Sequence, residues 1–362
     1  MPENEAMIAV GLVAVAAITL VAQPLASVSS QEFADKPVKL ANGIVGELTN
    51  FESRSPADFA PMLSGRLGPR VVLNAQLFRP RDCTSCPAVV FVPGSGNIGP
   101  HHLAQASALT DSGLAVLLID PFRGRGIDQT ISDQAKLSWA ASTFDVIAAV
   151  RHIRTLRGID GDRVGAAGNS RGGTAVMLAA AAPISLRFLG KSNIKAIVAG
   201  YPWCGTQFWS AKLAPSTSML VLSGAKDDWV SVQQCQDAVH AIDRAGGSAR
   251  INLFPGAYHA FDRHDMPLTR LEQVSTALTY PTVYMDDRGH YLNPQTGEPD
   301  PALGPAYFVQ DSIAGKFGKR GVTIGTHGTQ ARDYLDALVA FLSSQLQPTS
   351  TRDKKRPDNK QG

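Results

Sequence analysis

The chain has 362 residues, of which 44% are hydrophobic and 18% are charged, and its formal net charge is +3. This composition is typical of a globular protein with a sizeable core, built as one large domain or as a domain with an extension. Because the charge is nearly balanced, and part of the positive excess lies at the C-terminus, the sequence does not argue for nucleic-acid binding. We assign residues 347–362 to a disordered basic tail.

An uncharged apolar run from residue 6 to residue 22 lies near the N-terminus. Its length suits either the core of a signal peptide or a short membrane anchor. No Lys or Arg precedes the run, and no clean cleavage site follows it. We expect residues 1–30 to direct export, so that the protein is periplasmic or secreted. Cleavage of this segment and membrane attachment through residues 6–22 both stay open.

The four cysteines are an even number, which fits export to an oxidising compartment. Cys83 and Cys86 lie in a loop just before an apolar run. A thioredoxin-like pair would begin a helix, so the pattern favours a small loop disulfide, and a thiol-disulfide activity of this pair is the alternative. A zinc site would need a second pair of ligands at suitable spacing, and none is evident. We predict neither a metal nor a cofactor.

Short apolar runs alternate with helical segments from residue 70 onwards. The run 88–92 is uninterrupted, as expected of a strand buried on both faces. The predicted strands are 70–80, 88–92, 114–119, 196–199, 219–222 and 250–254, and the predicted helices are 102–111, 132–156, one from 231 and 331–346. This order predicts an α/β domain over residues 36–346, with a doubly wound, mostly parallel sheet and helices on both faces. Ligands bind at the C-terminal ends of the strands in such sheets.

The stretch 163–173 passes from a short apolar run through Gly-Asn-Ser-Arg-Gly into an Ala-rich segment that favours helix. A strand, a tight turn and a helix in this order are typical of a nucleophile elbow, with Ser170 at the turn. Gly168 and Gly172 remove side chains that would collide where strand and helix approach each other. The motif alone is a weak signal, since an ordinary glycine turn has the same letters. The flanking pattern favours the elbow.

A serine nucleophile needs a base to take its proton and a carboxylate to orient that base. Asp227 follows the predicted strand 219–222, and His259 follows the predicted strand 250–254. Taken singly, these residues are compatible with a turn or cap residue and with a hydrogen-bonded loop histidine. Together with Ser170 they give the order serine, acid, histidine at three successive suitable strand ends, which predicts a catalytic triad.

At this point the sequence resembles the dienelactone hydrolase family of the α/β-hydrolase superfamily, over most of residues 71–261 and again over 331–346. The residues that carry the resemblance are 93–96, 120–126, 168–173, 224–228 and 255–261. It looks most like an exported branch, because 201–204 and 229–235 have counterparts there. The enzyme that names the family has a cysteine nucleophile, whereas this chain has Ser170, so dienelactone is not implied as substrate.

The resemblance implies an α/β-hydrolase fold and an oxyanion hole made by the backbone N–H groups of Ser95 and Arg171. It also places the triad acid third after Gly224, at Asp227 rather than at Asp228. Ser231 begins a capping-box pattern, so we expect the next helix to start there and to need neither acid as its cap.

Two further features follow from the order of the elements. Cys204 and Cys235 lie in loops or first turns that neighbouring parallel strands place side by side, which predicts a second disulfide. The stretch from about 262 to 328 is an insertion that the compact family fold does not need, and long loops of this kind are often lids. Its acidic and histidine residues, among them Asp286 and His290, are better explained by a solvated turn than by a metal site.

The sequence therefore predicts an exported serine hydrolase that cleaves a small-molecule carboxylic ester through an acyl-enzyme, with Ser170, His259 and Asp227 as its triad. One alternative keeps the triad but cleaves peptides or transfers acyl groups. The other is a thiol-disulfide protein that uses Cys83 and Cys86. A non-catalytic binding module is the least favoured alternative, because each of the three loops keeps its triad residue.

Overall fold

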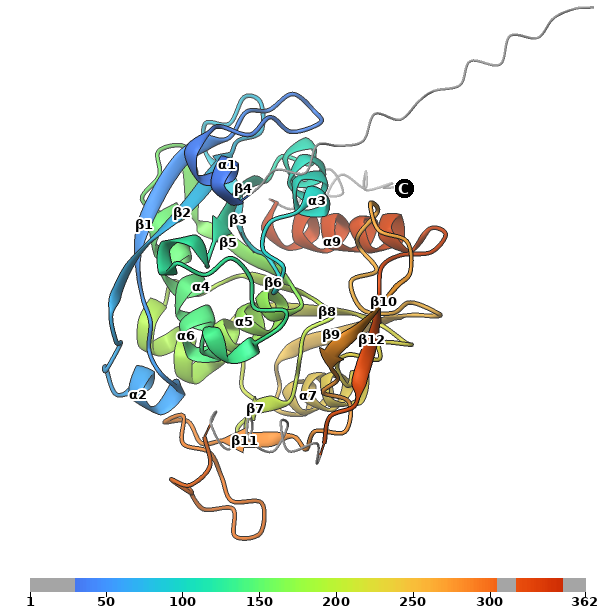
Figure 1. The fold of residues 1–362 in the computed structure, drawn as a ribbon. Coiled ribbons are helices and arrows are strands. Elements are labelled where there is room, and N and C mark those ends of the chain that lie inside the picture. Colours follow the sequence, from blue (N-terminus) through green and yellow to red (C-terminus); the bar gives the residue numbers. More distant parts are fainter. Residues whose placement is uncertain (1–29, 305–316, 348–362) are drawn as a thin grey trace, which may run out of the picture.

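The computed structural model describes residues 30–304 and 317–347, and its centre is one twisted sheet (Figure 1). The sheet has eight strands. In spatial order they are β1 (Glu47–Arg54), β2 (Arg70–Phe78), β4 (Ala115–Asp120), β3 (Cys86–Val92), β5 (Ile159–Asn169), β6 (Ala196–Gly200), β8 (Ser218–Gly224) and β9 (Ser248–Phe254). Only β2 pairs antiparallel, with β1 and β4, and the other neighbours are parallel. The predicted mostly parallel α/β sheet is confirmed.

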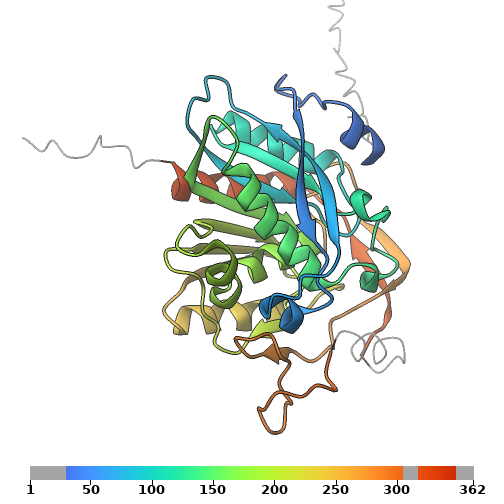
Figure 2. The ribbon, with the colours of Figure 1, turned by 90° about the vertical axis from the view of Figure 1, so that its left-hand side faces the viewer.

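Helices cover both faces of the sheet because its inner strands are buried on both sides (Figures 1 and 2). Alternate residues of β3 point to opposite layers. The covering helices are α3 (Pro100–Asp111), α4 (Trp139–Ile153), α5 (Arg171–Ala180), α6 (Ala182–Leu189), α7 (Val232–Arg244) and α9 (Gln330–Leu346). Val90 packs in a core cluster with α4, α5, α6 and α7, whereas Phe91 packs in a second cluster with α3 and α9.

The parallel register aligns the C-terminal ends of the strands at one edge. Val92 of β3 lies opposite Gly168 of β5, and Asn169 lies opposite Gly200 of β6. Gly224 of β8 lies opposite Phe254 of β9. The loops that leave these strands carry Ser95, Ser170, Asp227 and His259, so the fold gathers all four at the same edge.

Most predicted elements differ from the structure by one or more residues at their ends, and the starts of two helices have a clear physical reason. The helix predicted over 132–156 is α4, which begins at Trp139 because the Ser138 side chain caps it by accepting a hydrogen bond from Ala141 N at 2.9 Å. The residues before it instead contain a short 3₁₀ turn, η2 (Gln134–Lys136). The helix predicted from 231 begins at Val232, with Ser231 as its N-cap. Only half of the expected capping box is present, since the Gln234 side chain donates to the carbonyl of Tyr280 instead.

The insertion contributes short strands outside the main sheet. Strands β10 (Thr269–Ser275) and β12 (Arg320–Ile324) form an antiparallel ribbon, and β11 (Val283–Met285) pairs in parallel with β7 (Thr206–Phe208). None of the helices in the described ranges combines the length and the apolar character that crossing a membrane requires. The predicted export or anchor segment at 6–22 and the basic tail from 348 lie outside the described residues.

Candidate active site

Ser170 lies at the turn between β5 and α5, with φ of 51° and ψ of −115°. A positive φ is unusual for a residue with a side chain and costs on the order of 1–3 kcal/mol, which the surrounding structure must hold in place. Both flanking glycines are needed for this turn. A Cβ atom on Gly168 would lie 2.5 Å from the backbone of Gly172, and one on Gly172 would lie 2.2 Å from the carbonyl oxygen of Val92. The elbow geometry predicted from the sequence is therefore present.

The structure brings Ser170, His259 and Asp227 together in one hydrogen-bonded chain. His259 Nε2 lies 2.9 Å from Ser170 Oγ, and His259 Nδ1 lies 2.7 Å from Asp227 Oδ2. An ionised carboxylate can only accept, so Nδ1 carries the proton and Nε2 is left to accept from the serine hydroxyl. His259 is 1% exposed and Asp227 is 7% exposed. The imidazole is thus held in the tautomer that a general base requires.

The two adjacent acids have different partners. Asp227 Oδ1 accepts from the backbone N–H groups of Trp229 and Val230, at 2.9 and 3.0 Å, which fixes its other oxygen toward His259. The Asp228 side chain turns to the insertion, where it accepts from the backbone N–H of Thr323 at 2.7 Å and from its hydroxyl at 2.9 Å. Only Asp227 reaches the imidazole.

Arg171 directly follows Ser170, and the loop that contains Ser95 approaches the same turn. Arg171 is the first residue of α5, where a helix has backbone N–H groups without intrahelical partners and the positive end of its dipole. The loop that contains Ser95 touches the elbow, because a Cβ atom on Gly94 would lie 3.3 Å from the Cβ of Ser170. Ser95 is 6% exposed. The loop that carries Ser95 therefore meets the elbow at which Ser170 precedes Arg171.

A second polar network, which the sequence did not reveal, links the elbow to the histidine loop. The buried carboxylate of Asp262 accepts from Tyr201 Oη at 2.6 Å, Gln105 Nε2 at 2.7 Å and Asn169 Nδ2 at 2.7 Å. Asn169 directly precedes Ser170, and the Tyr201 ring packs edge-on against the ring of His259 at 4.7 Å. Burial raises the pKa of Asp262 above its usual value, although the Tyr201 hydrogen bond lowers it. Desolvation likewise raises the pKa of Tyr201.

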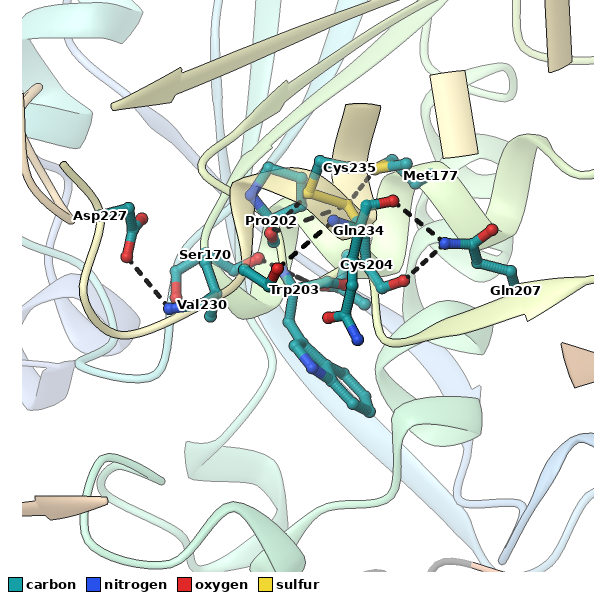
Figure 3. The surroundings of a disulfide bond; sticks show 12 residues. Ser170, Met177, Pro202, Trp203, Cys204, Gln207, Asp227, Val230, Gln234 and Cys235 are labelled. Atoms are coloured by element: carbon teal, nitrogen blue, oxygen red, sulfur yellow. Dashed lines mark hydrogen bonds between the residues drawn. A yellow bond between two sulfur atoms is a disulfide. The ribbon is translucent and has the colours of Figure 1, made fainter. Parts of the chain in front are cut away.

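The Cys204–Cys235 disulfide joins the loop after β6 to the start of α7 (Figure 3). Gln207 reinforces this link by donating from Nε2 to the carbonyls of Cys204, at 2.9 Å, and Gln234, at 3.1 Å (Figure 3). Next to Cys204, Trp203 N donates to Thr174 Oγ1 on the first turn of α5 at 2.9 Å. The disulfide therefore fastens the helix that follows the acid loop to the elbow helix.

The other cysteine pair, Cys83 and Cys86, is also joined as a disulfide. Cys86 is the first residue of β3, whereas Val92 is its last. Six residues of extended strand span about 20 Å, so this pair lies at the opposite edge of the sheet from Ser170. It begins a strand rather than a helix, which differs from the geometry of thioredoxin-like sites.

The described part of the insertion is attached to the acid and histidine loops. The backbone N–H of Gly325 donates to the carbonyl of His259 at 3.0 Å, and that of Ala277 donates to the carbonyl of Trp229 at 2.7 Å. Asp286 accepts from the N–H groups of Arg288 and His290 in a tight turn. Across residues 30–304 and 317–347, no group of His, Cys, Asp or Glu is arranged to hold a metal ion.

The model of the dienelactone hydrolase family matches residues 73–279. The chain belongs to this family. The match continues past residue 262, so the core that the family shares includes the start of the predicted insertion. The protein is therefore a hydrolase, and its sheet and elbow are those of the α/β-hydrolase superfamily.

The sequence identity between this chain and individual relatives is low. The chain is 26% identical over 232 residues to the "Probable 2-oxo-3-(5-oxofuran-2-ylidene)propanoate lactonase" of Bradyrhizobium sp, a match that covers 61% of this chain and 91% of that protein. Esterase 2 of Thermogutta terrifontis, solved after phosphorylation by paraoxon, has a TM-score of 0.43 and 19% identity, and covers 54% of this chain and 82% of its own. A dienelactone hydrolase candidate from Klebsiella pneumoniae subsp. pneumoniae has a TM-score of 0.43 and 20% identity, with 60% and 89% covered.

Proposed function

We propose that the protein is a serine hydrolase that cleaves a small-molecule carboxylic ester through an acyl-enzyme. The observation that carries this proposal is the hydrogen-bonded chain from Ser170 Oγ through His259 to Asp227, at 2.9 and 2.7 Å. Nucleophile, base and orienting carboxylate within hydrogen-bond reach are what nucleophilic acyl transfer needs.

In the acylation step, His259 Nε2 takes the hydroxyl proton of Ser170 while the serine oxygen attacks the ester carbonyl carbon. The backbone N–H groups of Ser95 and Arg171 stabilise the negative charge that develops on the carbonyl oxygen. When the tetrahedral intermediate collapses, the bond to the leaving oxygen breaks and His259 returns its proton to the departing alcohol. Asp227 stabilises the imidazolium that exists between these two proton transfers.

In the deacylation step, His259 takes a proton from a water molecule, and the resulting hydroxide attacks the acyl carbon. The intermediate expels Ser170, which regains its proton from His259, and the carboxylic acid leaves. One ester and one water thus give one acid and one alcohol, and the protein returns to its starting state.

An ester as substrate class is supported by the Bradyrhizobium relative, whose name describes a lactonase, because a lactone is a cyclic ester. The triad geometry suits peptide amides and acyl transfer as well, so the test is a panel. Wild type and Ser170→Ala should be assayed on p-nitrophenyl esters of increasing acyl length, on simple lactones and on peptide amides, with product analysis. We expect acid and alcohol from esters or lactones with wild type only. Cleavage of amides alone would contradict the proposal.

Thiol-disulfide activity is disfavoured by the position of Cys83 and Cys86 at the far edge of the sheet and at the start of a strand. The Ser170→Ala protein provides the control, because insulin reduction by Cys83 and Cys86 would persist in it.

We also propose that the protein is exported. The two disulfides support this, since such bonds persist in oxidising compartments. Fractionation of the source cells, followed by N-terminal analysis of the mature chain, tests export and shows whether residues 1–30 are removed. Recovery of the intact chain from the cytoplasm alone would contradict it.

A further inference from the structure

Gln134 connects the two residues whose backbone N–H groups would form the oxyanion hole. Its side-chain oxygen accepts from Ser95 Oγ at 3.1 Å and from the Arg171 guanidinium, at 3.2 Å from Nε and 2.8 Å from Nη2. Ser95 belongs to the loop after β3, and Arg171 begins α5. One amide oxygen therefore bridges the loop after β3 and the first turn of α5.

The segment that carries Gln134 is itself held on both sides. The backbone carbonyl of Gln134 accepts from Arg171 Nη2 at 2.6 Å, and the carbonyl of Leu137 accepts from Arg171 Nη1 at 2.9 Å. Toward the other loop, Thr130 N donates to the carbonyl of Ser95 at 2.9 Å. Residues 130–137 thus form a strap across the oxyanion loop and the elbow helix, with Gln134 near its middle.

The Arg171 side chain holds this strap through hydrogen bonds in a buried environment. The residue is 3% exposed, its guanidinium lies 4.2 Å from the centroid of the Trp139 ring, and its further partner is Ser142 Oγ. In the part of the chain that the structure describes, no carboxylate forms an ion pair with Arg171. Burial lowers the pKa of Arg171 to about 9, so the guanidinium stays protonated at neutral pH. The direct hydrogen-bond acceptors of this buried cation are neutral, and the charge of Asp133 favours it without an ion pair, so the guanidinium would be left poorly solvated if Gln134 were lost.

We propose that Gln134 is a positioning residue for the oxyanion hole, holding the Ser95 loop against the first turn of α5. This inference rests on the proposed function, because an oxyanion forms only if Ser170 attacks a carbonyl. Oxyanion donors stabilise the transition state when they lie about 2.7–3.1 Å from the oxygen, so a small separation of the two loops weakens catalysis. The ground-state ester carries no such charge and should bind almost as before.

The test replaces Gln134 by Met, which keeps the length of the side chain but removes the accepting oxygen. Lys136→Met is the matched control, because Lys136 lies in the same 3₁₀ turn and is exposed. For each protein, kcat and KM are measured on the ester that wild type cleaves fastest. The inhibition constant of 1,1,1-trifluoro-4-phenylbutan-2-one is also measured, since attack by serine on this ketone gives an anionic tetrahedral adduct.

We expect Gln134→Met to lower kcat by about 10–100-fold, somewhat less than the loss of a whole oxyanion donor, with KM changed by less than about 3-fold. The inhibition constant of the ketone should rise by a similar factor, and Lys136→Met should match wild type. A purely structural role would lower the melting temperature without moving ketone affinity and kcat in parallel. Unchanged kcat and ketone affinity in folded Gln134→Met would overturn the inference.

If Gln134→Met does not fold, Ser95→Ala decides the matter. This variant removes the hydroxyl that Gln134 binds and keeps the backbone N–H of residue 95. We expect a loss of about 3–10-fold in kcat, with a parallel loss of ketone affinity, because one of the two sides of the bridge is released. Wild-type values for both would refute the positioning role while leaving the proposed function intact. A wild-type protein that is inert to all esters and to the ketone would refute both.

Discussion

Asp262 Oδ2 accepts a hydrogen bond from Asn169 Nδ2 at 2.7 Å. Asp262 lies three residues after His259, and Asn169 directly precedes Ser170. The same carboxylate accepts from Tyr201, whose ring packs on His259. The elbow and the histidine loop leave different strands, β5 and β9, yet they share this buried acceptor. The distance between Ser170 and His259 is therefore fixed by contacts on the core side of both residues as well as by their own hydrogen bond.

The first prediction concerns Asp262. Replacement by Asn should lower the free energy of unfolding by about 2–3 kcal/mol at pH 5, because an NH₂ group would replace one of the two oxygens that accept from the three donors. The folded pKa of this carboxyl is raised above 3.8, so the folded state holds its proton more tightly than the unfolded chain. The wild type therefore loses the stability that comes from this tighter proton binding as the pH rises from about 4 through the folded pKa. Asp262→Asn has no carboxyl at this position and does not lose it.

The difference in stability between the two proteins should consequently be largest near pH 4 and smaller at pH 8. Urea denaturation at both values measures it. Asp265→Asn is the control, because Asp265 is partly exposed and pairs with Arg263 at 3.5 Å. A difference that grows with pH would contradict the raised pKa.

The second prediction separates Asp227 from Asp228. Asp227→Asn should disturb the tautomer and orientation of His259 and lower kcat by up to ~10⁴-fold, as in other triads. Asp228→Asn should have a much smaller effect, since Asp228 contacts Thr323 and lies 3.6 Å from Arg270 rather than touching the imidazole. Ester kinetics of both variants, with folding checked by circular dichroism, measure this. A larger loss from the Asp228 change would overturn the assignment.

The third prediction concerns the disulfide between Cys204 and Cys235. Replacing both residues by Ser should lower the free energy of unfolding by about 2–5 kcal/mol, because the unfolded chain gains freedom over the 31-residue separation. The matched Cys83→Ser, Cys86→Ser variant should lose less, since that bond spans only 3 positions. Peptide mapping without reductant checks the bonds themselves. Two free thiols at 204 and 235, in protein made in an oxidising compartment, would refute the pairing.

The fourth prediction keeps the expectation that the insertion shapes substrate choice. The structure shows where it can be shortened: Asp300 N donates to the carbonyl of Tyr291 at 2.9 Å, so the ends of the loop between them are already adjacent. Replacing residues 293–298 by Asn-Gly, which suits a two-residue hairpin turn, should leave the melting temperature within a few degrees.

Relative kcat/KM values across acyl lengths should change in this shortened protein. If the preference stays the same, this loop is not part of the lid. Cutting the β10–β12 ribbon instead would not be a fair test, because β12 holds Asp228 and its neighbour Gly325 bonds to the His259 carbonyl.

The main sheet and the Ser170–His259–Asp227 chain could be predicted because their signals are local. Uninterrupted apolar runs mark the buried strands, and glycines mark the elbow. The residues that the sequence did not reveal act through long-range contacts. Gln105 and Asp262 are 157 positions apart, and Gln134 is 37 from Arg171. No periodicity or spacing encodes such pairs. The structure of the insertion could not be predicted for the same reason, since its strand β11 pairs with β7, which lies far earlier in the chain.

The central claim is that Ser170 is the nucleophile, and covalent labelling tests it most directly. The folded, active protein is treated with a fluorophosphonate, digested, and the modified peptide is sequenced by mass spectrometry, with Ser170→Ala as the control. We predict a single adduct on Ser170 with parallel loss of ester hydrolysis, and no adduct in the variant. An adduct on another residue that accompanies inactivation, or full activity without labelling of Ser170, would contradict the account.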